Sequence, residues 1–199
     1  MIFDSISDID PKSAQAMLAD FQQIMQRASY PKNHLLHKED TVCNDLYFIE
    51  QGLARAFYFK DGQDITAHIA VENTSITAID SFIQRKRSRY NIELLEDSVV
   101  IYMPHKELHE LLAQKPQYEK LIRIYLQEIY IDLAERVEDL LFHTAKERYD
   151  KLLSKNPGLL QRINLKHIAS YVGITQETLS RIRGKDWVFE FDICQVDWF

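Results

Sequence analysis

Hydrophobic residues recur at helical spacing near the start of the chain. Asp10 is a residue type that caps helices, and the proline after it favours a first helical turn. From there to position 28, apolar residues lie three or four positions apart. We therefore predict a helix over residues 10–28. Its apolar positions are Ala14, Met17, Leu18, Phe21, Ile24 and Met25.

Between residues 30 and 103 the pattern changes to short apolar runs rich in β-branched and aromatic residues. Turn-forming residues separate these runs at positions 50–52 and 60–64. Polar and apolar residues alternate within several of them, as they do in half-buried strands. Many short strands joined by brief turns predict a sandwich, barrel or jelly roll. The clearest runs are residues 46–49, 54–59, 65–69 and 99–102.

Residues 107–142 return to helical spacing, and Pro116 is expected to divide them into a short and a long helix. Tyr125, Tyr130 and Ile131 place apolar groups beyond a single stripe on the long helix. Such a helix is expected to contact its own domain and a second helix. We interpret it as a dimerisation helix; the alternative is a helix buried within one chain. Its main stripe consists of Ile122, Leu126, Ile129, Leu133, Val137 and Leu140.

Two short helical patterns near the C-terminus are separated by a glycine. Asn164 is a suitable cap for a helix over residues 165–171, and Thr175 for one ending near residue 183. Gly173 can adopt the positive φ that a tight turn between helices requires. A helix, a short turn with glycine and a second helix predict a helix-turn-helix.

The second of these helices has a polar face that suits DNA. In a helix-turn-helix its N-terminal part enters the major groove. Arg reads guanine, Gln reads adenine and Glu accepts from cytosine N4, while hydroxyl and basic groups contact phosphate. The alternative is an ordinary helical hairpin with a solvated polar face. The candidate DNA-binding residues are Thr175, Gln176, Glu177, Thr178, Ser180, Arg181, Arg183 and Lys185.

Charge is unevenly distributed in this acidic chain, whose formal net charge is −6. Residues 143–185, which begin with a predicted helix over 143–156, hold nine Lys and Arg against three Asp and Glu. Residues 186–199 hold four acidic residues and no basic one. Nucleic-acid binding depends on such local fields, because phosphate contacts displace condensed counterions. The basic segment therefore strengthens the case for DNA binding.

Composition excludes several other classes of protein. With 46% hydrophobic and 27% charged residues, the chain is expected to fold as a globular protein. Its apolar runs are far shorter than the roughly 20 residues of a membrane span, and the N-terminus does not resemble a signal peptide. Cys43 and Cys194 are the only cysteines, too few for a disulfide framework or a Cys-rich metal site. We expect a cytoplasmic location and no contact with a membrane.

Two segments resemble the Crp–Fnr family, the catabolite activator protein superfamily of bacterial regulators. Residues 172–181 read Val-Gly-Ile-Thr-Gln-Glu-Thr-Leu-Ser-Arg, and residues 144–153 resemble the helix that leads into the DNA-binding domain. The resemblance covers about residues 5–185. By position, Gln176, Glu177 and Arg181 match the three base-reading positions of the family, although the first is usually Arg or Ser.

The resemblance implies an α+β fold in three parts. An N-terminal double-stranded β-helix, a jelly roll of the cyclic-nucleotide-binding type with N-terminal helices, is expected over residues 1–106. A dimerisation helix region is expected over residues 107–142. A helix-turn-helix domain is expected over residues 143–199.

The nucleotide-binding cassette departs from the pattern of the family. Relatives carry Phe-Gly-Glu and, about ten residues later, an Arg followed by Ser or Thr and Ala. Residues 78–91 contain no Gly-Glu pair. We therefore expect no cyclic AMP binding, and we interpret the basic run 85–89 either as a site for another anion or as a solvated loop. The tentative effector pocket consists of Asp80, Arg87, Ser88 and Arg89.

The end of the chain departs as well. Relatives usually carry a winged β-hairpin after the recognition helix. Residues 188–193 suit one strand, but no turn residues follow that would let it return. We expect a reduced or missing wing and an acidic tail that packs on protein.

A third class, the metal-dependent cupin enzyme, needs clustered His and carboxylate ligands. His34 and His37 are expected to precede the strands, and His68 stands alone, so we predict neither a metal nor an enzyme. No cofactor is implied. The leading hypothesis is a homodimeric DNA-binding transcription regulator, with double-stranded DNA, RNA polymerase and a small-molecule effector as expected partners. The alternative is a ligand-binding or interaction β-roll without DNA binding.

Overall fold

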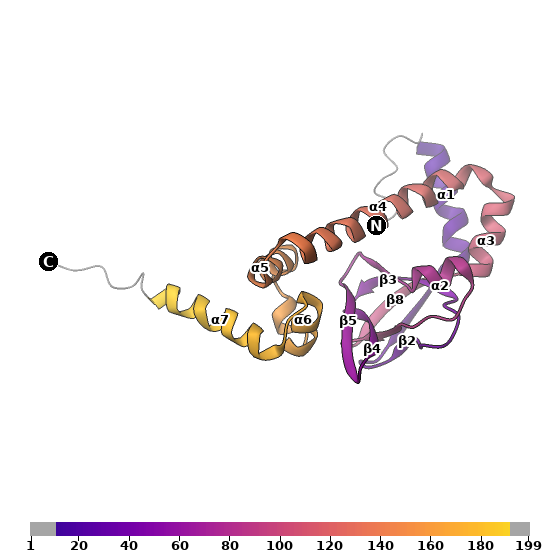
Figure 1. The fold of residues 1–199 in the computed structure, drawn as a ribbon. Coiled ribbons are helices and arrows are strands. Elements are labelled where there is room, and N and C mark those ends of the chain that lie inside the picture. Colours follow the sequence, from indigo (N-terminus) through magenta and orange to yellow (C-terminus); the bar gives the residue numbers. More distant parts are fainter. Residues whose placement is uncertain (1–10, 192–199) are drawn as a thin grey trace.

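The computed structural model describes the backbone of residues 11–191 and the side chains of residues 12–184 (Figure 1). Helix α1 covers Pro11–Ile24, with Met17 and Phe21 buried. The helix predicted over residues 10–28 is wrong at its C-terminal end, because Gln26–Tyr30 forms strand β1. Pairing of β1 along strand β8 (Ser98–Pro104) satisfies its backbone and overrides the helical spacing. Asp10 lies outside the described residues.

Eight strands form two four-stranded sheets, in the orders β1-β8-β3-β6 and β2-β7-β4-β5. All of their pairs are antiparallel. This β-roll confirms the predicted jelly roll, and each of the four runs singled out in the sequence lies within a strand. The remaining strands are β2 Leu35–His37, β3 Asp45–Gln51, β4 Ala54–Lys60, β5 Gln63–Ala70, β6 Ser75–Ile76 and β7 Asn91–Leu94.

The core of the roll lies between the sheets and extends under the helices. Leu46–Ile49 of β3 are buried at four consecutive positions, because helices cover the outer face of this strand. On that face, the Phe48 ring lies 6.4 Å from the Tyr125 ring. Helix α2 (Ile79–Gln84) closes the roll with the buried Phe82.

The helical region after the roll is divided as predicted. Helix α3 (His105–Gln114) is followed by a 3₁₀ turn, η2 (Pro116–Tyr118), and by the long helix α4 (Glu119–Phe142). Pro116 begins the turn between the two helices and confirms the predicted break. Figure 1 shows α4 running from the roll to the C-terminal helices.

Four further helical elements complete the described chain: α5 Ala145–Lys155, η3 Leu159–Gln161, α6 Leu165–Val172 and α7 Gln176–Phe191. A capping box between Thr144 and Glu147 starts α5. A second apolar core holds these helices together.

Helix α7 is longer than the helix predicted to end near residue 183. The strand predicted over residues 188–193 is wrong for its described part, since residues 188–191 are helical. A lone strand without a returning partner leaves its backbone groups unpaired, whereas a helix pairs them internally. Residues 192 and 193, and the expected packing of the tail, lie outside the described residues.

Candidate nucleic-acid interface and effector domain

The turn between α6 and α7 has the geometry expected of a helix-turn-helix. The Asn164 side chain caps α6 by accepting a hydrogen bond from the Lys166 N–H at 3.0 Å. Gly173 ends α6 with φ at 83°, and its N–H donates to the Ala169 carbonyl. The Thr175 hydroxyl accepts from the Thr178 N–H at 3.2 Å and caps α7. The predicted caps and the positive φ of the glycine are confirmed.

Buried apolar side chains fix how α7 lies on α6. Ile168 and Val172 of α6 and Leu179 of α7 are fully buried, and Ala169 is nearly so. The small Ala169 side chain lets the two helices approach closely. The orientation of α7 about its own axis is therefore set by Leu179, and the opposite side of the helix faces outward.

The candidate base-reading residues lie on that outward side. Gln176, Glu177, Ser180 and Arg181 are exposed, as are Thr175 and Thr178. Arg183 is half-buried, and the Lys185 side chain lies outside the described residues. A hydrogen bond from its own backbone N–H and a bond from Thr175 lower the pKa of Glu177, so this carboxylate stays ionised as an acceptor.

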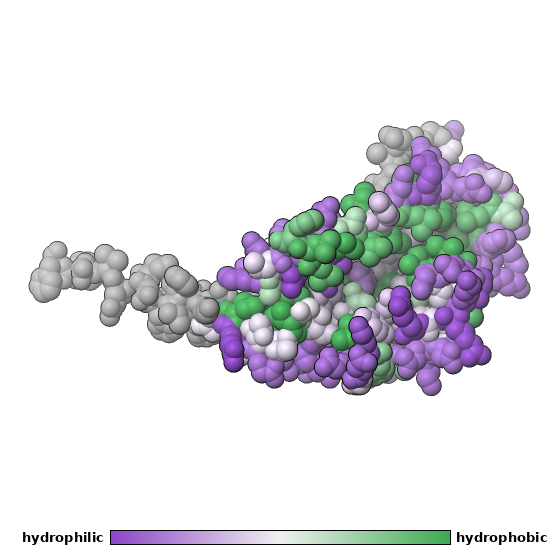
Figure 2. Space-filling model, viewed as in Figure 1, coloured by the Kyte–Doolittle hydropathy of each residue, from purple (hydrophilic) through white to green (hydrophobic). Residues whose placement is uncertain are grey.

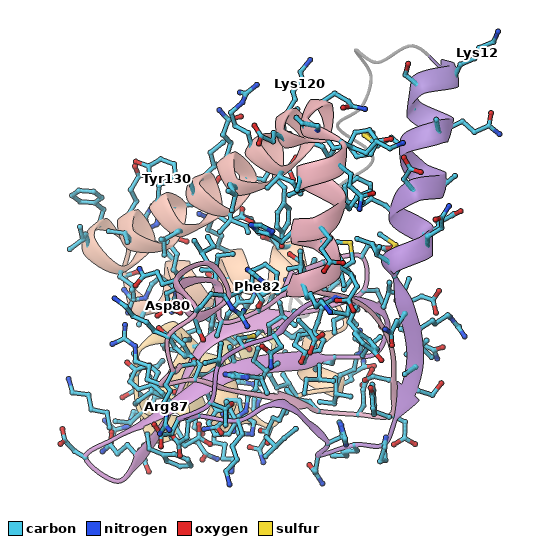
Figure 3. All side chains as sticks on the ribbon, turned by 90° about the vertical axis from the view of Figure 1, so that its right-hand side faces the viewer. Lys12, Asp80, Phe82, Arg87, Lys120 and Tyr130 are labelled. Atoms are coloured by element: carbon cyan, nitrogen blue, oxygen red, sulfur yellow. The ribbon has the colours of Figure 1, made fainter. Side chains whose placement is uncertain are left out.

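The tentative effector residues do not form one cluster of free groups. Arg87 is exposed and bonds to Asp40 at 3.0 Å, and Arg89 stacks over Tyr90 at 5.4 Å. Ser88 is buried and accepts from the Tyr90 N–H at 2.9 Å. Figure 3 shows Asp80 on α2 and Arg87 in the loop that follows it.

Arg85, the first residue of the basic run, is tied to the protein. It ends α2 with a left-handed φ of 56°. Its guanidinium donates to the Cys43 carbonyl at 2.8 Å and also to the Asn44 side chain. Asp80 is exposed in the first turn of the same helix. The donors of Arg85 are thus used for closing the roll.

Helix α4 presents two different apolar sides. One side packs on the roll through buried Leu121 and Tyr125, and the Tyr125 hydroxyl donates to Ser75 Oγ at 2.7 Å. Ile122 and Ile129 are partly buried against the same core. The other residues of the stripe are exposed: Leu126 (37%), Leu133 (60%), Val137 (47%) and Leu140 (48%).

The exposed side of α4 forms an extended apolar surface. Figure 2 shows hydrophobic residues gathering along this helix. Tyr130 is 71% exposed, and in Figure 3 its ring points away from the chain. Beside it lies an open hollow of about 350 Å³, lined by Leu112, Glu119, Ile122, Arg123, Leu126, Gln127 and Tyr130.

Two contacts that the sequence did not reveal join the helix-turn-helix to the roll. Ser170 of α6 bonds to the backbone of β5, and Arg162 bonds to carboxylates of the roll. Ser170 lies in the predicted helix over residues 165–171, but neither residue has a sequence signature for these contacts, and their partners lie at least 66 positions away in the chain. No local pattern could have identified them.

Within residues 11–191, no group of three or more His, Cys, Asp or Glu is placed to hold a metal ion. The expectation that His34 and His37 precede the strands is wrong for both, since His34 lies between β1 and β2 and His37 ends β2. Across the same residues, no helix combines the length and the apolar character that spanning a membrane requires.

The described chain thus combines a β-roll, a long helix beside it and a helix-turn-helix. Residues 27–115 match the family model of the cyclic nucleotide-binding domain. No curated protein sequence matches the chain.

Three solved structures of regulators share the fold. The c-di-GMP-responsive global regulator CLP of Xanthomonas campestris aligns with a TM-score of 0.69 and 14% identity, over 88% of this chain and 93% of that one. FixK2 of Bradyrhizobium japonicum aligns with 0.68 and 19%, over 81% and 84%. The catabolite activator protein of Thermus thermophilus aligns with 0.54 and 18%, over 100% and 91%. The resemblance to Crp–Fnr proteins is thus confirmed at the level of the fold.

Proposed function

We propose that the protein is a homodimeric transcription regulator that binds double-stranded DNA and has no enzymatic activity. The helix-turn-helix domain, residues 143–199, would read DNA in the cytoplasm. Residues 107–142 would pair two chains, and the roll, residues 1–106, would serve as an effector domain. RNA polymerase remains an expected partner of such a regulator.

One observation carries the DNA-binding part of this proposal. Buried Leu179 anchors α7, while Gln176, Glu177, Ser180 and Arg181 stand exposed on the side away from it. These are donors and acceptors of the kinds that read base edges in the major groove. They lie in the basic segment of an otherwise acidic chain. An ordinary helical hairpin needs neither feature.

The exposed apolar side of α4 supports dimerisation. Soluble proteins rarely leave a continuous apolar stripe of this length uncovered. A second α4 packed along Leu133, Val137 and Leu140 would cover it by coiled-coil-like contact. Two recognition helices related by a two-fold axis would then read half-sites about one DNA turn apart.

The roll is proposed not to bind cyclic AMP. The guanidinium group of Arg85 bonds to the protein, Arg87 bonds to Asp40, and Arg89 stacks on Tyr90. A cyclic phosphate would have to compete with these contacts. We expect no heat of binding when cyclic AMP is titrated into the protein in a calorimeter; a saturable heat would refute this part of the proposal.

Selection of bound duplexes from a random DNA pool at moderate salt tests the proposal directly. The expected result is an enriched, nearly palindromic sequence with a fixed spacing. If no duplex is bound in a salt-dependent way, the alternative of a ligand-binding or interaction module is favoured instead.

Arg181→Ala is the most specific variant for this test. Loss of a bidentate contact to guanine should cost roughly 1–3 kcal/mol at one base position and relax the preference there. Lys155→Ala is a suitable control, because it removes a charge from the same segment but lies on α5. Gel-shift titrations on the selected duplex and its single-base variants measure the affinity and the base preference of each protein variant. Unchanged preference at every position in Arg181→Ala would exclude this residue as a base reader.

A further inference from the structure

The helix-turn-helix domain is docked on the roll of its own chain. Helix α6 lies along β5, where the Ser170 hydroxyl accepts from the Thr66 N–H at 2.9 Å. The same hydroxyl lies 3.2 Å from the Asp64 carbonyl and donates to it. One serine thus joins α6 to the backbone of a strand more than 100 positions earlier in the chain.

Apolar packing beneath this contact is continuous between the two domains. Leu53 and Leu95 belong to turns of the roll, yet they pack in the core of the C-terminal helices rather than in the core of the roll. Leu53 is fully buried and Leu95 is 8% exposed. Their neighbours there are Tyr149, Leu159, Ile163, Ile168, Ala169, Val172 and Leu179.

Arg162 closes the edge of this interface with five hydrogen bonds to three turns of the roll. It donates to the two carboxylate oxygens of Glu72 at 2.6 and 3.0 Å and to those of Glu96 at 2.6 and 3.2 Å. It also donates to the Gly52 carbonyl at 3.0 Å. Glu72 in turn accepts from the Gly52 N–H at 3.0 Å. We call Arg162, Glu72, Glu96 and Gly52 the latch.

The charges of the latch make it sensitive to the loss of Arg162. The guanidinium bond is the largest cause that lowers the pKa of Glu72 to about 2. Bonds to Glu96 and Glu72 raise the pKa of Arg162 itself. Without the guanidinium, two ionised carboxylates would remain close together at the domain boundary. Their repulsion would act to separate the loops that now hold the helix-turn-helix.

The docked arrangement leaves the reading side of α7 open. Gln176, Glu177 and Arg181 are exposed while the latch is closed. The latch therefore does not mask the DNA-binding surface. What it fixes is the position of α7 relative to the roll, and through the contact of the roll with α4, relative to the proposed dimer axis.

We propose that Arg162 is a positioning residue for DNA recognition, which sets the distance between the two recognition helices of the dimer. The proposal rests on the DNA-binding function proposed above. In a dimer, α4 would hold the two rolls together, and each latch would hold one α7 against its own roll. With the latch bonds formed, the dimer accepts one half-site spacing. Without them, α7 moves relative to the roll and the dimer accepts several spacings.

The test uses the full chain and a set of duplexes in which two selected half-sites are separated by different numbers of base pairs. The wild-type protein should prefer one spacing over its one-base-pair neighbours by about tenfold or more. Arg162→Gln should reduce this preference to about threefold or less, with the base preference within each half-site unchanged. Arg162→Lys, which keeps the charge but not the fork of donors, should fall between them. A purely structural role would lower affinity for all spacings alike.

Lys106→Gln is the matched control, since Lys106 is 79% exposed and pairs with Glu110 of its own helix α3, so it belongs neither to the latch nor to a contact between the helical domain and α4. It should keep the wild-type spacing profile. Glu96→Gln is the second variant, because it weakens the latch from the other side and covers the case in which Arg162→Gln does not fold. Wild-type spacing profiles in every latch variant that folds would overturn the proposal.

A readout without DNA separates this proposal from the proposed function. Hydrogen exchange at the Thr66 amide reports docking, because this N–H donates across the interface. Arg162→Gln and Glu96→Gln should speed this exchange at least about tenfold, and Lys106→Gln should not. Faster exchange in a protein that binds no duplex would refute the DNA-binding function but support the latch. Unchanged exchange in the latch variants would refute the latch whether or not DNA is bound.

Discussion

Gly52 occupies a position in the latch where no side chain fits. Its φ is +111°, and an added Cβ would lie 2.1 Å from the Ser98 hydroxyl oxygen and 2.9 Å from the Ser98 backbone. Its N–H and carbonyl groups bond to Glu72 and Arg162. A glycine is therefore needed both for the turn between β3 and β4 and for the approach of the helical domain.

We expect Gly52→Ala to destabilise the protein much more than Gly62→Ala. Gly62 also has a positive φ, of 76°, but an added Cβ would meet nothing within 4 Å. Gly62→Ala should cost about 1–2 kcal/mol, from backbone strain alone. Gly52→Ala adds a clash that only backbone movement relieves and should cost at least about 3 kcal/mol. Urea unfolding of both variants measures the difference, and equal losses would contradict the steric argument.

At the scale of elements, α4 has two apolar sides, one packed on the roll and one exposed. Tyr125 and Leu121 face the roll, while Leu133 is 60% exposed. Ile131 is 56% exposed but lies roughly opposite Leu133, because two residues turn a helix by about 200°. The two side chains are similar in size and exposure and differ in the side of the helix on which they stand.

Leu133→Gln is expected to weaken the dimer, and Ile131→Gln to leave it unchanged. Loss of one leucine from a coiled-coil-like seam should cost roughly 1–3 kcal/mol for each copy, and two copies meet at the axis. Sedimentation of both variants over a range of concentrations gives the dissociation constants. A wild-type constant for Leu133→Gln, or equal weakening in both, would show that this stripe is not the dimer interface.

Elements with a local signal were predictable from the sequence, and elements with long-range partners were not. The caps Asn164 and Thr175 and the positive φ of Gly173 all act within a few residues, and all are confirmed. Strand β1 was taken for helix because its partner, β8, lies some 70 positions later. Residues 188–191 have strand-like composition but find no partner strand in the described chain.

The residues of the candidate site also fall into these two groups, those with a local sequence signal and those with long-range partners. The exposed positions of Gln176, Glu177 and Arg181 follow from helical periodicity once Leu179 is assigned to the core. Arg162 could not be found, because an arginine between two helices has no pattern that identifies carboxylates 66 and 90 positions earlier. Sequence periodicity therefore predicts the proposed DNA-binding surface, whereas only the fold reveals what holds that surface in place.

At the scale of the whole molecule, the docked domains meet around a histidine. His167 of α6 is 8% exposed, and the charged groups that act on it are Arg55, Asp64 and Lys166. Arg55 is itself buried and bonds to Asp64 and to Glu93. Burial, and then the positive charge of Arg55, lower the pKa of His167 to about 4. The docked domain therefore holds this imidazole in its neutral form.

This arrangement predicts that the protein loses stability as the pH falls from about 6.5 toward 4. When His167 is released from the interface, its pKa returns to near 6.5. Between about pH 6.5 and 4, the released imidazole is therefore protonated, whereas the docked imidazole stays neutral. The contribution of neutral His167 to the free energy of unfolding is therefore fully present above about pH 6.5. Below that pH it falls by up to about 1.4 kcal/mol per pH unit, and the total loss is on the order of 3 kcal/mol.

Between pH 6.5 and 4.5, the effect of this histidine can be measured apart from that of the acidic residues at the interface. The pKa values of Glu72 and Asp64 are lowered from their ordinary values of 4.5 and 3.8, so the stability that they contribute is lost mainly at lower pH. Urea unfolding between pH 7 and pH 4.5 should therefore show a smaller decline in His167→Gln than in the wild type. His34→Gln, at an exposed position of the roll, should follow the wild type. Parallel declines in all three proteins would mean that acid does not act on the docked domains through His167.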